Sequence, residues 1–119
     1  MIIGLGVDIT DLSRIEKAMT TSKLFAARVL TDKERQVYDS LGARRKVEFL
    51  GGRFSAKESY SKAYGTGIGS QLSFQDIEIL PEDSGRPQIS THPLGTDVRV
   101  SVSISHTAQV VLTEVIIEH

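Results

Sequence analysis

The chain has 119 residues and a formal net charge of −1, with 39% hydrophobic and 24% charged residues, which predicts a single domain over residues 1–119 with an ordinary buried core. The absence of cysteine excludes a disulfide framework and the cysteine-rich zinc sites, and 6% aromatic residues without tryptophan argue against a base-stacking nucleic-acid platform. No apolar stretch approaches the ~18 residues of a membrane span and no secretory signal is visible, so we expect a cytoplasmic protein that binds neither membrane nor nucleic acid.

The N-terminal part predicts a strand followed by helices. Ile2–Asp8 is short and apolar, which is typical of a strand. Gly4 and Gly6 within it mark a place where another backbone or a ligand comes close. The stretch from Leu12 to Val29 contains no proline and predicts one or two helices.

Two further helices are expected before the middle of the chain. Thr31 and Glu34 have the spacing of a capping box, so a helix should begin there and run toward Ser40. Arg44–Tyr64 predicts the longest helix, and its pair Gly51-Gly52 marks a close-packing or bend point.

The second half of the chain predicts strands. Residues 65–69 contain three glycines and should end the long helix, residues 74–80 predict a strand, and residues 81–87 a turn-rich connector. Apolar and polar residues alternate over 98–105, as in a half-buried strand, and 109–117 predicts a last strand. Because helices and strands are segregated along the chain, we expect an α+β fold with an antiparallel sheet.

Two acids stand out against their surroundings. Asp8 ends an apolar strand, where a lone Asp most simply caps the following helix. Glu58 continues the apolar stripe of Leu50 and Phe54, and a carboxylate on a buried stripe needs a partner. Lys62, four residues on, is one candidate. Alternatively, Asp8 and Glu58 together hold a divalent cation such as Mg²⁺, which takes one or two carboxylates with waters and substrate phosphates. The spacing leaves these alternatives open.

The glycine-rich segment Gly65–Gly69 is a weaker signal. It follows a helix and no Gly-Lys-Ser/Thr comes after it, so it is neither a P-loop nor a dinucleotide-binding fingerprint. Its glycines either let backbone amides approach phosphate oxygens or simply end the helix. From the residues alone, phosphate handling is indicated only weakly.

The charge is unevenly distributed along the chain. Residues 1–65 hold 12 Lys and Arg against 8 Asp and Glu, a net of +4, whereas residues 66–119 hold 2 against 7, a net of −5. A basic N-terminal half favours anionic partners, such as phosphates or an acidic protein. Ordinary charged helices with a solvated face would give the same balance.

Three motifs follow one another along the chain: Gly6-Val7-Asp8, the segment Arg53–Ile68 with its Lys57-Glu58 and Gly65-Thr66-Gly67, and Ser103-Ile104-Ser105-His106. In this order and spacing they resemble the holo-[acyl-carrier-protein] synthases, the small class of 4'-phosphopantetheinyl transferases. The similarity covers essentially the whole chain. The departures, Phe54 where the family often has Trp and Ser59 where Ala is usual, change no expected ligand.

The resemblance implies the fold and the reaction. It implies the α+β fold of these transferases, with an antiparallel sheet packed against a long helix, and a homotrimer. The implied enzyme acts in fatty acid biosynthesis, moving the 4'-phosphopantetheine of coenzyme A onto a serine of apo-acyl carrier protein and releasing 3',5'-ADP, with Mg²⁺ as cofactor. The alternative is a non-catalytic CoA- or nucleotide-binding module, which needs no metal-holding acids such as Asp8 and Glu58.

The resemblance also implies roles for three catalytic residues. Asp8 and Glu58 would hold Mg²⁺ on the CoA pyrophosphate, neutralising the charge that builds up there. Glu58, or a metal-bound water beside it, would be the base for the serine hydroxyl. Lys62 would neutralise or protonate the leaving phosphate.

Binding roles follow from the same resemblance. Candidates for the ribose 3'-phosphate are Arg45, Arg53 and His106, since a fixed cationic fork suits a phosphate. The turn Gly65, Thr66 and Gly67 would bring backbone amides to the nucleotide. Arg14 and Arg28 are expected to bind the acyl carrier protein, although nearby Thr21 and Leu24 are not basic.

The last predicted strand gives the implied trimer physical sense. It is apolar on both faces, with Val110, Leu112 and Ile116 on one and Val111, Val115 and Ile117 on the other. Burying both faces in so small a domain is easier if a second chain covers one of them; the alternative is a strand enclosed by its own chain. In the trimer we expect active sites between subunits, with Asp8, Glu58 and Lys62 from one chain and His106 from its neighbour.

Overall fold

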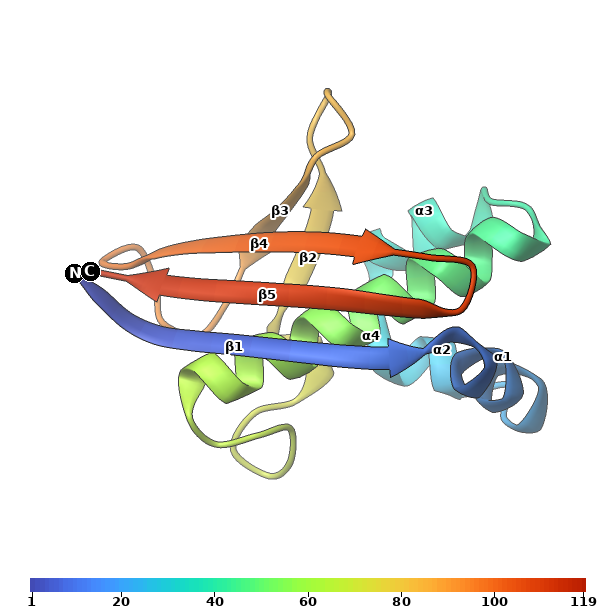
Figure 1. Cartoon of the computed structure of the whole chain (residues 1–119), viewed down its shortest axis with the longest axis horizontal. Coiled ribbons are helices and arrows are strands. Elements are labelled where there is room, and N and C mark those ends of the chain that lie inside the picture. The colour runs from blue at the N-terminus through green and yellow to red at the C-terminus, as the bar shows by residue number, and fades with distance from the viewer.

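The computed structural model describes all 119 residues. Along the chain it contains β1 (Ile2–Asp11), α1 (Leu12–Thr21), α2 (Phe25–Val29), α3 (Asp32–Asp39), α4 (Ala43–Tyr64), a 3₁₀ turn (Phe74–Asp76), β2 (Glu78–Pro81), β3 (Pro87–Thr91), β4 (Arg99–His106) and β5 (Val110–Glu118). The strands form an antiparallel sheet in the order β1-β5-β4 and a separate hairpin, β2-β3 (Figure 1).

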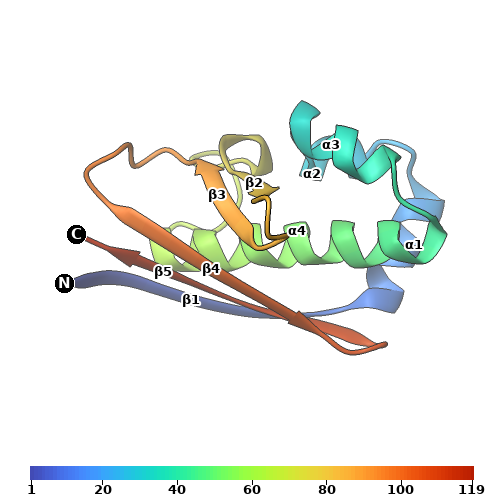
Figure 2. The same ribbon diagram turned by 90° about the horizontal axis from the view of Figure 1, so that it is seen from above.

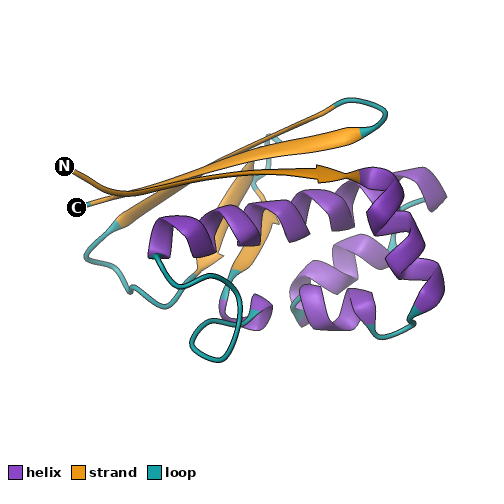
Figure 3. Ribbon diagram, turned by 60° about the horizontal axis from the view of Figure 1, so that its bottom comes forward, coloured by secondary structure: helices purple, strands orange, loops and turns teal.

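Helix α4 lies between these two sheets. Figure 2 shows the three-stranded sheet on one side of α4, with the hairpin and α3 on the other. The helices α1, α2 and α3 gather at one end of the molecule (Figure 3). The apolar core therefore has two parts: one packs around Ile15 and Leu50 at the helical end, and the other around Tyr60 and Ile79 beneath the hairpin. None of the helices, α4 included, is long and apolar enough to cross a membrane.

The glycines of β1 let the strand lie directly on α4. A Cβ at Gly6 would overlap the carbonyl oxygen of Ser59, and one at Gly4 would overlap that of Ala63. The close approach predicted from these glycines is confirmed, and the approaching backbone is that of α4. This contact brings the inner face of β1, including Asp8, against the C-terminal half of the helix.

The antiparallel sheet with helices is confirmed, whereas the region between α4 and β4 differs from the prediction. Phe74–Asp76 forms a 3₁₀ turn capped by Ser73, and the strand begins only at Glu78. The connector predicted over residues 81–87 is the turn of a hairpin, and β3 after it was not predicted. Ile89 is the only buried residue of β3. The sequence of β3 therefore lacks the apolar run that would have predicted a strand.

One face of the three-stranded sheet packs on α4, and its other face, turned to the viewer in Figure 1, is bare within the chain. The apolar side chains on this outer face are well exposed: Leu5 by 59%, Val7 by 46% and Ile9 by 67% on β1, and Leu112 by 46% on β5. On the inner face Val111, Val115 and Ile117 are buried. The predicted two-faced apolar pattern of β5 is confirmed, and the alternative of a strand enclosed by its own chain is wrong.

Candidate active site

Asp8 is held on the inner face of β1 by groups from two elements. Its Oδ2 accepts hydrogen bonds from the hydroxyls of Thr10 at 2.7 Å and Ser55 at 2.8 Å, and its Oδ1 lies 3.3 Å from Lys62 Nζ. The ammonium of Lys62 also donates to the carbonyl of Val7 at 2.9 Å. Asp8 does not cap α1, whose N-cap position is Asp11. The helix-cap interpretation is therefore wrong, and the carboxylate faces α4.

Glu58 is half-buried on α4 beside this carboxylate, one turn from both Ser55 and Lys62, and its own carboxylate makes no hydrogen bond or ion pair. The pKa of Glu58 is raised, first by its partial burial and then by the negative charge of Asp8, while Lys62 and Arg14 act in the opposite direction. The pair of Glu58 with Lys62, one of the alternatives that the spacing left open, is not formed, because Lys62 pairs with Asp8. Two acids from different elements thus influence each other, and one is unpartnered.

The pKa of Glu58 should respond to both neighbours in metal-free protein. Asp8→Asn removes a negative charge and should lower this pKa, whereas Lys62→Met removes a positive charge and should raise it. In the parent chain Glu58 should protonate at a higher pH than its ordinary value of 4.5, so a reaction step that needs its ionised form declines as the pH falls through that raised value. A ¹³C NMR titration of the carboxyl measures this. An unchanged pKa in both variants would contradict the facing arrangement.

Asp8 and Glu58 suit a small, hard cation. Nowhere in the chain do three or more His, Cys, Asp or Glu side chains come together as a complete metal site. Mg²⁺ does not need one, since it is typically held by one or two carboxylates with waters and substrate phosphates. A cation here would also offset the negative charge of Asp8, which after partial burial is the second cause of the raised pKa of Glu58. The two residues therefore fit Mg²⁺, provided that the rest of its shell comes from outside the chain.

Arg45, Arg53 and His106 line a cleft of about 380 Å³, bounded also by α3 and the turn of the β2-β3 hairpin. Two guanidinium groups and an imidazole in one cleft are suited to binding an anion. Glu48, which was not predicted, lies in the same cleft, 3.9 Å from the Nε of Arg45. The grouping of the three expected residues in one place is a result that their spacing in the sequence did not predict.

Arg53 is the fixed member of this group. Its side chain is only 7% exposed, its Nε donates to the carbonyl of Ile79 at 3.1 Å, and its guanidinium lies 4.2 Å from the centroid of the Phe49 ring. Burial lowers the pKa of Arg53 to about 10, against the opposing effect of Glu34, so it remains protonated at neutral pH. Its terminal nitrogens have no partner in the chain and are free to hold an anion.

Within one chain the predicted site residues form two separate groups. Arg45 and Glu58 lie thirteen residues apart on α4, about 20 Å along the helix axis. Arg53 and Glu58 point to different sides of that helix, since Arg53 reaches β2 whereas Glu58 senses Asp8 on β1. The acid group (Asp8, Glu58 and Lys62) and the cation group (Arg45, Arg53 and His106) do not meet in a single chain.

The glycine turn ends α4. Gly65 and Gly67 have left-handed φ angles of 104° and 71°, and the backbone N–H of each donates to the carbonyl of Ser61, at 2.9 and 3.3 Å. The helix-ending interpretation is confirmed. These two amides are already bonded within the chain, whereas the N–H of Thr66 in this turn has no partner there. The approach of the turn to a nucleotide stays a prediction.

The two expected docking arginines lie at the helical end. Arg14 on α1 stacks over the ring of Phe54 at 5.9 Å, close enough to Glu58 to influence its pKa. Arg28 on α2 donates to the hydroxyl of Ser22 and lines a second cavity of about 500 Å³. Between them, Phe54 contacts Phe25 and Phe74 with ring centroids 5.9 and 5.5 Å away. The arginines thus flank one aromatic cluster.

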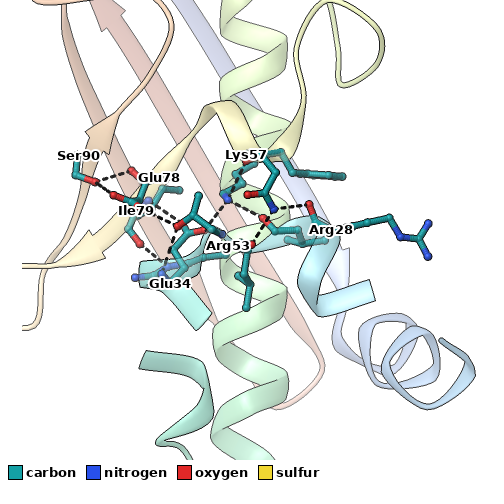
Figure 4. A network of polar contacts seen from close by, with 12 residues as sticks. Arg28, Glu34, Arg53, Lys57, Glu78, Ile79 and Ser90 are labelled. Atoms are coloured by element: carbon teal, nitrogen blue, oxygen red, sulfur yellow. Dashed lines mark hydrogen bonds and ion pairs between the residues drawn. The ribbon is translucent and has the colours of Figure 1, made fainter. Parts of the chain in front are cut away.

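The fully buried charge on α4 is Lys57 rather than Glu58. Lys57 and Glu34 are both fully buried, and the Lys57 Nζ lies 2.7 Å from Glu34 Oε1 (Figure 4). Glu34 was expected only as part of a capping box, which it does form with Thr31, and Lys57 was assigned no role. Because other elements cover α4 on both sides, a single apolar stripe in its sequence does not identify which of its residues are buried and which are exposed.

The chain resembles known proteins over nearly its whole length. Residues 4–115 match the model of the 4'-phosphopantetheinyl transferase superfamily. Holo-[acyl-carrier-protein] synthases of Geobacillus sp. (strain WCH70) and Levilactobacillus brevis are 49% and 52% identical over 118 residues, covering 99% of this chain and 98% and 95% of theirs.

Solved structures resemble the chain as well. The holo-(acyl-carrier-protein) synthase of Bacillus anthracis, in complex with CoA (3',5'-ADP), has a TM-score of 0.90 at 46% identity and covers 99% of this chain and 97% of its own. The holo-[acyl-carrier-protein] synthase of Neisseria meningitidis has a TM-score of 0.89 at 36% identity over the full length of both chains. The chain therefore belongs to the 4'-phosphopantetheinyl transferase superfamily, among its holo-[acyl-carrier-protein] synthases.

Proposed function

We propose that the chain transfers the 4'-phosphopantetheine of coenzyme A to a serine of apo-acyl carrier protein, giving holo-acyl carrier protein and 3',5'-ADP for fatty acid biosynthesis. The observation that carries this proposal is the unpartnered Glu58 beside Asp8 and Lys62, with a separate cationic cleft, in a chain so similar to a synthase solved with CoA (3',5'-ADP). A single domain over residues 1–119 and a cytoplasmic location stay predictions.

The acid group supplies the chemistry. Asp8, fixed by Thr10 and Ser55, and Glu58 would hold Mg²⁺, which when bound neutralises charge on the CoA pyrophosphate. Glu58 takes the proton of the attacking serine hydroxyl, a role that suits a carboxylate with a raised pKa. The serine oxygen forms its bond to the phosphorus of the phosphopantetheine as the pyrophosphate P–O bond breaks. Lys62 neutralises the phosphate of the departing 3',5'-ADP.

The cation group holds the nucleotide. Arg53, buried and with free terminal nitrogens, and the more exposed Arg45 and His106 would bind the ribose 3'-phosphate. The test of the whole proposal is incubation with CoA, Mg²⁺ and an apo-carrier protein, followed by mass spectrometry of the carrier. We expect a gain of one phosphopantetheine group, lost when EDTA replaces Mg²⁺. CoA binding without any mass gain would instead identify a non-catalytic CoA-binding module.

We propose further that the active form is a homotrimer with active sites between subunits. Its support is the outer face of the sheet, formed by Leu5, Val7, Ile9 and Leu112, since exposed apolar patches of this kind mark interaction surfaces. A second support is the separation of the acid and cation groups within one chain. Assembly is the simplest way for both groups to act on one CoA molecule.

Docking of the carrier protein should be electrostatic, through Arg14 and Arg28 at the basic helical end. Attraction to an acidic carrier weakens with salt, because the Debye length shrinks from ~10 Å at 0.1 M to ~3 Å at 1 M. The apparent KM for the carrier should therefore rise across this range and should rise again in Arg14→Glu. Steady-state kinetics measure both, with Lys33→Glu, an exposed charge reversal on α3, as the control. A flat salt dependence, or equal effects of the two variants, would contradict this docking mode.

A further inference from the structure

A fully buried ion pair lies behind the cationic cleft. The Nζ of Lys57 donates to Glu34 Oε1 at 2.7 Å and to the carbonyls of Val29 at 2.6 Å and Phe74 at 3.0 Å. All three ammonium protons are therefore used. A buried ion pair is by itself weak support for stability, since apolar residues of the same volume often serve as well. What this pair contacts is more informative.

The Glu34 carboxylate is hydrogen-bonded to one edge of β2. Its Oε2 accepts a hydrogen bond from the N–H of Ile79 at 2.7 Å, while the carbonyl of the same Ile79 accepts from the Nε of Arg53 at 3.1 Å (Figure 4). The N–H and the carbonyl of one strand residue point to the same edge of the strand. Glu34 and Arg53 thus bind the N–H and the carbonyl of Ile79 on a single edge of β2. Lys57 pairs with the carboxylate of Glu34 and fixes its position.

The rest of the network fixes this edge. The Oε1 of Glu34 also accepts from the N–H of Thr31 at 2.8 Å, and the Thr31 hydroxyl donates to Glu78 Oε2 at 2.6 Å. Glu78 in turn accepts from the hydroxyl of Ser90 on β3 at 3.1 Å. The bond between Thr31 and Glu78 ties the hairpin to the start of α3, while the other two bonds brace the α3 cap and the hairpin themselves. The position of the Ile79 carbonyl relative to α4 is therefore fixed. Because the Nε of Arg53 donates to this carbonyl, its position is fixed as well.

We propose that Glu34 and Lys57 are positioning residues for Arg53: they fix the β2 edge that holds its Nε, so that its terminal nitrogens face the cleft. The proposal rests on the role assigned above to Arg53, the binding of the ribose 3'-phosphate. Glu34 acts on Arg53 in a second way, because its negative charge favours the protonated guanidinium in a buried place. Loss of Glu34 should therefore weaken phosphate binding, although Glu34 itself makes no contact with the ligand.

A purely structural role must be separated from positioning. We would titrate the full-length protein by calorimetry with adenosine 3',5'-bisphosphate and with adenosine 5'-monophosphate, which lacks the 3'-phosphate, at a temperature where circular dichroism shows each variant folded. The ratio of the two affinities isolates the 3'-phosphate contact. The matched control is Ile117→Ala, which removes a fully buried apolar side chain that makes none of the network's hydrogen bonds and should lower the melting temperature with an unchanged ratio.

We expect Arg53→Ala and Glu34→Gln each to lower this ratio about tenfold, as for the loss of one charge-assisted hydrogen bond. Glu34→Gln should add nothing in an Arg53→Ala background. The double variant Glu34→Gln/Lys57→Met leaves no uncompensated buried ion and should show the same lowered ratio in a better-folded protein. If Arg53→Ala lowers the ratio and neither Glu34 variant does, the positioning role is wrong. If Arg53→Ala has no effect, the assignment of Arg53 to the 3'-phosphate fails, and the positioning role with it.

Discussion

Asp8→Ala and Glu58→Ala should each abolish phosphopantetheine transfer while the protein stays folded. Each variant removes one of two carboxylates that fit the metal, and Glu58→Ala also removes the proposed base. Folding should survive because Glu58 is half-buried without a partner and Asp8 pairs with the partly exposed Lys62. The carrier mass assay measures transfer, and thermal melts measure stability. Asp39→Ala, which removes an exposed acid on α3, is the control and should keep full activity.

A structural role for the two acids makes the opposite prediction. Removing one partner of a buried ion pair typically destabilises a protein by ~3–5 kcal/mol. If the melting temperature of Asp8→Ala falls sharply while its residual transfer keeps the metal dependence of the parent, the acid serves the fold. An Mg²⁺ titration of each variant separates the two readings, since a lost ligand raises the metal concentration needed for any remaining activity.

The fold was predictable where local rules decide it. The capping box at Thr31 and Glu34 is formed, and the glycines of β1 do mark a backbone contact. The prediction failed where packing between neighbouring layers determines which residues form a strand or become buried. β3 has a single buried apolar residue and could not be found from alternation. On α4 the fully buried charge is Lys57, one residue from Glu58, because a helix between two sheets is covered on nearly all sides.

The sequence predicted which residues form the site, but it did not predict how their side chains are arranged and paired. The motifs predicted that Asp8, Glu58 and Lys62 act together, and the structure brings them together. Their pairing was left open by the spacing, and in the structure Lys62 pairs with Asp8 across the gap between β1 and α4. Ser55 was missed as a partner of Asp8 because its position there depends on how closely β1 lies on α4. No local pattern in the sequence reports that distance.

The separation of the acid and cation groups also leads to the second large effect, complementation between inactive chains. If each active site takes its acid group from one subunit and its cation group from a neighbour, Glu58→Gln damages only the acid group of its chain, and His106→Ala only the cation group. A subunit carrying His106→Ala still supplies an intact Glu58, and its Glu58→Gln neighbour still supplies an intact His106. Sites that combine these two intact contributions should work.

Co-refolding an equal mixture of Glu58→Gln and His106→Ala chains should therefore restore activity to about a quarter of the sites, the share expected for random assembly of a cyclic trimer. The carrier mass assay measures the restored rate, and each variant must first be shown to be severely impaired alone. The matched control is a mixture of His106→Ala with Arg45→Ala. Both changes damage the cation group, so no interface in that mixture is intact and no activity should return. If native mass spectrometry detects mixed trimers that stay as inactive as their parents, each site lies within one subunit, and the acid and cation groups do not act on the same CoA molecule.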